Sequence, residues 1–236
     1  MGLNLARYAT NSAFLNLTAR YFFDPYNPYA GRLVNDAFLS KYWIPSTGAW
    51  LRFYAPSDRN TTANMANNYW GTTSTILIDA AIYDYNDDFN IGRIEYQPIL
   101  TTPAETTYPF VWKVVISQGS ENLTRLGPGE TTFTVTFNRD MDTTVQPQVS
   151  FGPDTPVTDY TIHPVNGGWQ NPRTWVGTFN INPITGDGYQ LMRIAGPARA
   201  ASDPWLVIGD DSGRFRFEII TSGTEAMNLQ ATGGEG

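Results

Sequence analysis

Residues 131–137 read "TTFTVTF", and this stretch decides how the second half of the 236-residue chain folds. Phe133, Val135 and Phe137 fall on one side of the segment, and threonines alternate with them on the other. Successive side chains of a β-strand point to opposite faces, so a period of two predicts a strand with one buried face. The segment "RFRFEI" at 214–219 alternates in the same way.

Other short segments of strand composition lie around these two. They are "WKVVIS" (112–117), "PQVSF" (147–151), "DYTIH" (159–163), "WVGTFNI" (175–181) and "YQLMRI" (189–194). Gly, Pro, Asn or Asp residues separate them, and none has helical spacing. Short strands at regular intervals predict an antiparallel β-sandwich over residues 110–222.

Three stretches of this half also resemble a bacterial immunoglobulin-like domain of cell-surface proteins. They are "TFTVTFNRDMDTTVQPQVSFG" (132–152), "GTFNINPITGDGYQLMRIAG" (177–196) and "GRFRFEIITSG" (213–223). The resemblance implies that Met141 closes the core, that the acidic residues beside it lie in a turn, and that the domain acts as a spacer or an adhesive module.

The first half carries a different resemblance. "NNYWGTT" (67–73), followed by "ILIDAAIYDYNDDFNIGRIEYQPIL" (76–100), is similar to the closing region of right-handed parallel β-helix proteins of the pectate-lyase-like type. The resemblance implies a last coil, a short helix that covers the open core, and a final strand. Asn16 and Asn35 lie 19 residues apart, close to the length of one coil of such a solenoid.

Two interpretations compete for the segment "YDYNDDFNIGRIE" (83–95). In the first, Ile78, Ile82, Tyr85 and Phe89 form one stripe of an α-helix, so that Phe89 is buried at the end of the stack of coils. Ser74 or Thr75 would cap the start of this helix, and Asn90 or Gly92 would end it. We favour this interpretation.

In the second interpretation the same segment binds calcium, the one cofactor that the sequence suggests. The candidate ligands are Asp84, Asn86, Asp88, Asn90 and Glu95. An EF-hand loop needs glycine at its sixth position, where this chain has Phe89. The calcium interpretation is therefore the alternative.

The expected fold class is all-β. Residues 1–100 are expected to form the last coils of a parallel β-helix with a short capping helix, and residues 110–222 an antiparallel immunoglobulin-like β-sandwich. The segment "TTPAETTYP" (101–109) predicts an extended, hydrated linker between them. Residues 223–236 are expected to link to a further domain, and further coils of the same polypeptide are expected before residue 1.

Composition limits the partners. The net charge is −7, and Lys41 and Lys113 are the only lysines, with scattered arginines as the other basic residues. A nucleic-acid partner is not expected, because no basic stripe could neutralise a phosphate backbone. Proline and glycine interrupt every apolar run, so no membrane span is expected. The chain has no cysteine and no recognisable secretion signal, and its two ends suggest a piece of a longer secreted protein, located outside the cell or on its surface.

No motif in the sequence specifies a reaction. His163 is the only histidine, and the pairs Asp87–Asp88, Asp140–Asp142 and Asp210–Asp211 all have turn composition. Aromatic rings beside polar loops are the stronger functional indication, because sugar rings stack on aromatic surfaces.

The carbohydrate-binding candidates are Trp169, Trp43, Trp50 and Tyr54. The sequence thus predicts a non-catalytic structural or adhesive fragment of a secreted surface protein that binds polysaccharide. The alternative is a carbohydrate-active enzyme, either a glycoside hydrolase or a polysaccharide lyase, or its binding module.

Overall fold

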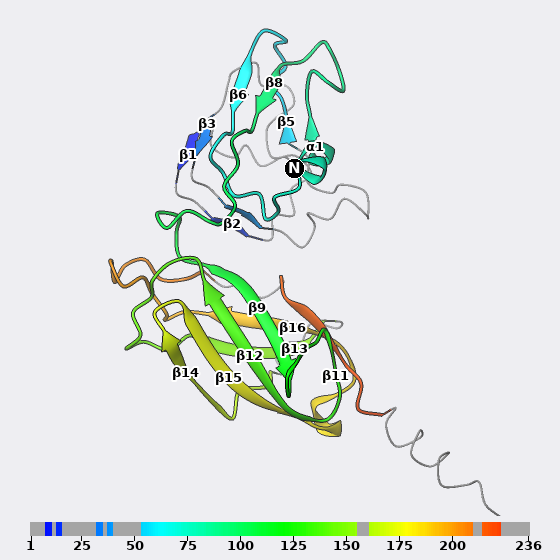
Figure 1. Ribbon diagram of the computed structural model, residues 1–236, viewed down its shortest axis with the longest axis vertical. Helices are drawn as coiled ribbons and strands as arrows, with labels where there is room; N and C mark the ends of the chain where they lie inside the picture. Colours follow the sequence, from blue (N-terminus) through cyan, green and yellow to red (C-terminus); the bar gives the residue numbers. More distant parts are fainter. Residues whose placement is uncertain are drawn as a thin grey trace, which may run out of the picture. The chain divides into compact units, whose positions relative to one another are not determined.

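The computed structural model describes residues 8–10, 13–15, 32–34, 37–39, 53–154, 161–209 and 214–222. The chain divides into two compact units, Met1–Tyr108 and Pro109–Gly236. Strands make up nearly all the regular structure of the described residues (Figure 1), as the prediction of an all-β chain requires.

Three parallel sheets lie in the described residues of the first unit. One has the strand order β1-β3-β6-β8, and the other two pair β2 with β4 and β5 with β7. The strands are β1 (Tyr8–Thr10), β2 (Ala13–Leu15), β3 (Arg32–Val34), β4 (Ala37–Leu39), β5 (Phe53–Tyr54), β6 (Thr62–Asn64), β7 (Ile82–Tyr83) and β8 (Arg93–Glu95).

Paired residues in these sheets are separated in sequence by a similar number of residues from one pair of strands to the next. Tyr8 pairs with Arg32 and Ala13 pairs with Ala37, so two neighbouring sheets share a step of 24 residues. The step suggested by the spacing of Asn16 and Asn35 is therefore too short, and both asparagines lie outside the described residues. Later partners lie somewhat further apart, as Thr62 and Arg93 do.

The core of the first unit is built around Trp70. Its ring lies 5.0 Å from that of Phe53 and 5.9 Å from that of Tyr96, both in edge-on contact. Met65 and Ile94 belong to the same buried cluster. These side chains belong to the parallel strands or to the turns next to them. The core therefore forms where the strands of the parallel sheets bring these side chains into contact.

The helix of this unit, α1 (Thr75–Ala81), is shorter than predicted. Ile78 is fully buried in the core, as the helical stripe requires, and Ser74 is the N-cap. The helix ends because Ile82 takes an extended conformation and pairs with Phe53 as β7. The prediction that Asn90 or Gly92 ends the helix is therefore wrong.

Phe89 is 69% exposed, so the prediction that it is buried in the core is also wrong. The chain leaves the helical path seven residues earlier, and Phe89 lies in the loop between β7 and β8. Tyr85, the other outer member of the predicted stripe, is 37% exposed, and the Arg93 guanidinium lies 3.9 Å from the centre of its ring.

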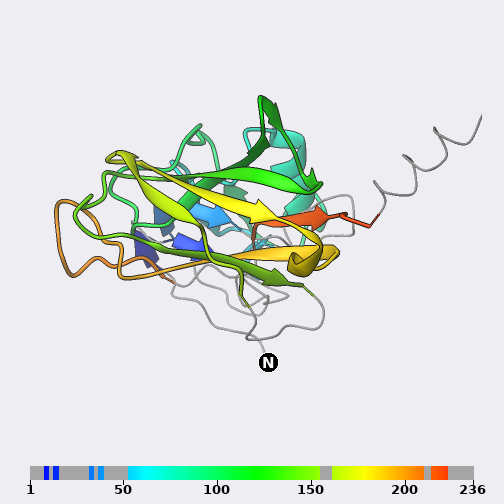
Figure 2. The same cartoon turned by 90° about the horizontal axis from the view of Figure 1, so that it is seen from below.

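The second unit, over its described ranges 109–154, 161–209 and 214–222, has two sheets. Their strand orders are β10-β9-β12-β15-β14 and β11-β17-β16-β13, and every pair is antiparallel except β11 with β17. Figure 2 shows them as two layers. The strands are β9 (Val111–Gln118), β10 (Glu121–Asn122), β11 (Arg125–Leu126), β12 (Gly129–Phe137), β13 (Gln148–Pro153), β14 (Asn166–Asn171), β15 (Thr174–Ile181), β16 (Gly188–Ala195) and β17 (Arg216–Ile219). A short 3-10 helix, η2 (Pro183–Thr185), follows β15.

Aromatic side chains from both layers meet between the sheets. Phe133 of β12 contacts Phe151 of β13, Phe179 of β15 and Phe217 of β17, with ring centres 4.5–5.9 Å apart. Met141 is buried in the same cluster, as the sequence predicts. The alternating residues of "TTFTVTF" and "RFRFEI" therefore face one common core.

Two segments of this half differ from prediction. The stretch "NGGWQN" forms strand β14, although its glycines give no alternating pattern. Within "DYTIH", Ile162 makes an isolated bridge with Phe151, whereas Asp159 and Tyr160 lie outside the described residues.

The segment 101–109 is not hydrated throughout. Thr107 is fully buried, and its N–H donates to the carbonyl of Ala104 in a turn.

Candidate functional site

Asp84 holds together the loop that could bind calcium. Its side chain is buried, and Oδ1 accepts the backbone N–H of Asn86 at 2.9 Å. Oδ2 accepts the backbone N–H of Ile94, ten residues further on, at 3.1 Å. The carboxylate therefore joins the turn after β7 to strand β8.

Among the other candidate ligands, Asp88 also accepts hydrogen bonds from its own loop. Oδ1 of Asp88 accepts both the backbone N–H and the side-chain amide of Asn90, each at 2.9 Å, and Glu95 is exposed on β8. Calcium needs about six to eight oxygen ligands. Within the described ranges, no three His, Cys, Asp or Glu side chains gather as metal ligands. The carboxylates of Asp84 and Asp88 therefore hold the backbone of their own loop, and calcium binding by this segment stays a prediction.

Gly92 allows the same loop to lie close to the backbone of residues 56–61. Its N–H donates to the carbonyl of Pro56 at 2.7 Å, and its own carbonyl accepts from Tyr85 at 2.8 Å. A Cβ atom at this position would lie 2.2 Å from the carbonyl oxygen of Thr61. Glycine is therefore required at this position by the close packing of two backbone segments.

Trp169, predicted as an exposed sugar-binding ring, is half-buried. The register between β14 and β15 places Trp169 opposite Trp175, and the ring of Trp169 lies 5.2 Å from that of Phe137. Its Nε1–H donates to the carbonyl of Val145 at 2.9 Å. Because its polar atom and much of its ring are already engaged, Trp169 stabilises the fold.

Among the other three aromatic candidates, only Tyr54 lies in the described part of the chain. It is half-buried in β5, with its ring 5.0 Å from that of Tyr83 in β7. Trp43 and Trp50 lie outside the described residues.

Trp205, which the sequence reasoning missed, is 87% exposed. It follows Asp203 and Pro204 in a turn, and its N–H donates to Oδ1 of Asp203 at 2.9 Å. The sequence signal was present, because an aspartate and a proline directly before an aromatic residue favour a surface turn.

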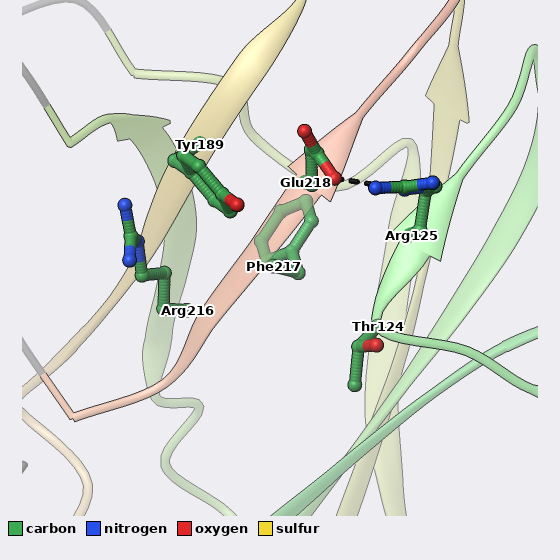
Figure 3. A pocket seen from close by; sticks show the side chains of 6 residues that line it. All are labelled: Thr124, Arg125, Tyr189, Arg216, Phe217 and Glu218. Carbon is green, nitrogen blue, oxygen red and sulfur yellow. Dashed lines mark hydrogen bonds and ion pairs between the residues drawn. The ribbon is translucent and has the colours of Figure 1, made fainter.

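A hollow of about 510 Å³ lies on the second unit (Figure 3). Its lining residues are Thr124, Arg125, Tyr189, Arg216, Phe217 and Glu218. They come from β11, β16 and β17 and the residue before β11.

The charged side chains of this hollow are paired with one another or with a neighbour. Nε of Arg125 donates to Glu218 at 2.8 Å, and Nε of Arg216 lies 2.8 Å from a carboxylate oxygen of Asp154. The Arg216 guanidinium also stacks on the ring of Tyr189, 3.6 Å from its centre. The hollow thus offers a half-exposed ring and hydrogen-bonding groups, but one face of the ring is already covered.

The carboxylate pairs suggested by the sequence also stabilise turns. Asp140 accepts from Nε of Arg173 at 2.5 Å, whereas Asp142 accepts from Thr144 and from Nε of Arg199. The Thr144 hydroxyl and Arg199 hold the pKa of Asp142 below its usual value. The two carboxylates thus have different partners.

The remaining candidates that can be described take part in local hydrogen bonds. Asp87 accepts the backbone N–H of Asp84 at 3.1 Å, and exposed His163 hydrogen-bonds through Nε2 with the Thr161 hydroxyl at 3.1 Å. Asp210 and Asp211 lie outside the described residues.

No protein-family model, curated protein or solved structure matches this chain. None of the helices in the described part of the chain is long and apolar enough to cross a membrane.

Proposed function

We propose that this chain is a non-catalytic structural or adhesive segment of a secreted surface protein that contacts polysaccharide. In this proposal the first unit is the last part of a parallel β-helix with a capping helix. The second unit is an immunoglobulin-like β-sandwich, and the segment works outside the cell.

The parallel register of the first unit supports the β-helix part of the proposal. Two neighbouring sheets advance by the same 24 residues, which is the geometry of coils stacked on one another. The two layers of the second unit, with their shared aromatic core, support the sandwich part.

The placement of the carboxylates is the observation that carries the non-catalytic assignment. Asp84 and Asp187 accept backbone N–H groups, and Asp140 and Asp142 accept from arginines. An enzyme that cleaves sugar chains by acid–base chemistry needs two carboxyl groups facing one substrate, about 5–10 Å apart. Each of these aspartates is already engaged by backbone N–H groups or by an arginine.

The enzymatic alternative can be tested directly. The purified chain is incubated with neutral and acidic polysaccharides, and the release of reducing ends and of unsaturated sugar products is measured. We expect neither product. Release that disappears in Asp140→Asn or Asp142→Asn, while both variants remain folded, would replace this proposal with a glycoside hydrolase or a polysaccharide lyase.

The location can be tested on intact cells of the source organism. A protease added outside the cells is expected to digest this segment while a cytoplasmic control protein survives. Full protection of the segment until the cells are lysed would contradict the surface assignment.

A further inference from the structure

Trp205 has the most exposed large apolar side chain in ranges 53–154, 161–209 and 214–222, with 87% of its surface accessible. Tryptophan carries a large apolar surface and is usually well buried. The neighbouring residues Ala201, Ser202 and Pro204 are also exposed, so the ring stands on an open part of the surface. Figures 1 and 2 show the loop that carries it, in orange, at one end of the second unit.

The Trp205 loop, residues 199–208, is held firmly at its base. Arg199 and Val207 form an antiparallel bridge, and the N–H of Ala200 donates to the carbonyl of Leu206 at 2.9 Å. At the turn itself, the carbonyl of Trp205 accepts from Val207 at 3.1 Å. The backbone on both sides of the ring is therefore ordered before any partner arrives.

A second segment, residues 139–142, braces the loop. Ala200 bridges to Met141, and the N–H of Ala201 donates to the carbonyl of Asp140 at 3.0 Å. The side chain of Arg139 donates to the Ser202 hydroxyl at 2.9 Å. A preorganised surface loses little conformational entropy on binding, which favours contact with a ligand.

In the part of the chain that the structure describes, positive and negative side chains of the loop and of the segments bonded to it are equal in number. Three arginines and three aspartates belong to the loop or to the segments bonded to it: Arg139, Arg173, Arg199, Asp140, Asp142 and Asp203. The Asp140 side chain is 58% exposed, so it can still reach a ligand. Trp205 is therefore an exposed aromatic ring surrounded by hydrogen-bonding side chains whose charges sum to zero.

We propose that Trp205 is the contact of this chain for a neutral polysaccharide, an inference that rests on the proposed adhesive function. The indole face stacks on the CH face of a sugar ring, and the side chains around it bind hydroxyl groups. A polyanion or an anionic lipid surface is disfavoured by the overall charge of −7. A protein partner would require a larger apolar centre than Trp205 and its small exposed neighbours Ala201, Ser202 and Pro204 supply.

Affinity gel electrophoresis tests this inference with the whole chain. The gels contain dextran, glucomannan or hydroxyethyl cellulose as neutral polymers, and polygalacturonate as the anionic one. The variants are Trp205→Ala and Trp205→Phe. Phe89→Ala removes another exposed ring as the matched control, and Tyr189→Ala tests the hollow as the rival site.

At least one neutral polymer should retard the wild-type protein. Trp205→Ala should weaken that binding at least tenfold, Trp205→Phe should keep part of it, and the other two variants should bind like wild type. Because Trp205 makes few contacts within the fold, its removal should leave thermal unfolding unchanged.

Four outcomes would overturn the inference: no retardation of the wild type by any neutral polymer, undiminished binding by Trp205→Ala, loss of binding in Tyr189→Ala alone, or retardation by polygalacturonate only. None of them bears on the absence of catalysis, which the release of sugar products tests separately.

Discussion

Gly177 lies directly against the indole of Trp175, so that a Cβ atom on the glycine would lie 2.2 Å from Cη2 of the ring. Gly167, opposite Gly177 in the neighbouring strand, approaches the same indole equally closely. The two glycines thus provide the space in which Trp175 is buried. Its Nε1–H donates to Oε1 of Gln146 at 2.9 Å, which fixes the ring there.

Gly167→Ala should therefore destabilise the second unit by about 1–3 kcal/mol, the usual cost of overpacking a filled core. Gly168→Ala is the matched control, because a Cβ at Gly168 meets no atom within 4 Å. Chemical unfolding followed by tryptophan fluorescence measures both variants. Equal stability of the two would show that Trp175 can move aside at little cost.

Gly92→Ala should destabilise the first unit by at least about 2 kcal/mol, because the atom in the way is the backbone oxygen of Thr61. Hydrogen exchange at the amide of Arg93, which donates to that same oxygen, reports the effect locally. Exchange in β12 of the second unit is the internal control. Unchanged protection at Arg93 would contradict the close approach.

Phe89→Ser should leave the stability of the first unit within about 0.5 kcal/mol of wild type, as is usual for exposed positions. Ile78→Ala, which opens a cavity at a fully buried position, should cost about 2–5 kcal/mol. The comparison separates the observed core from the one that the helical stripe predicted. A large loss of stability in Phe89→Ser would show that the Phe89 ring is buried in the core of the first unit.

Asp187 should make the stability of the second unit depend on pH. The hydroxyls of Ser222 and Thr221, together with their backbone N–H groups, donate to this carboxylate and hold its pKa well below the usual value. A depressed pKa in the folded state stabilises it at pH values above the unfolded pKa of about 3.9. That contribution is lost as the pH falls from there through the folded pKa.

Unfolding of wild type and Asp187→Asn between pH 7 and pH 2 checks this dependence. We expect the wild-type protein to be the more stable at pH 7, and the difference to shrink below about pH 4. Asp142, whose pKa is also lowered, keeps part of the pH dependence in both proteins. A difference that stays constant over the whole range would show that Asp187 does not titrate differently in the folded state.

Sequence patterns predicted the core of the second unit well, because strand alternation is a local property. Phe133, Val135 and Phe137 are all buried, as the alternation predicts. Met141, which only the resemblance to an immunoglobulin-like domain placed in the core, is buried as well. The pattern missed β14, because Gly167 and Gly168 have no side chain to mark a face. What makes this segment a strand is its pairing with β15 and the space that it leaves for Trp175.

The candidate site was much less predictable. The spacing of Asp84, Asn86 and Asp88 fits an ion-binding loop, yet the same side chains can accept N–H groups of their own loop. Local spacing cannot distinguish the two uses, since both place an oxygen close to the following residues. The exposure of a tryptophan side chain also depends on residues distant in sequence. The sequence therefore could not show that Trp205 is more exposed than Trp169.

The sequence by itself determined the all-β character of the chain, the buried faces of its longer strands and the start of its short helix, because these follow from local periodicity. Only the tertiary structure decided that the helix stops at Ala81, that Phe89 is exposed and that Trp205 is presented on a braced loop. The physical reason is that parallel strand pairs and close backbone contacts join residues many positions apart, and their free energies override the local preference of the chain.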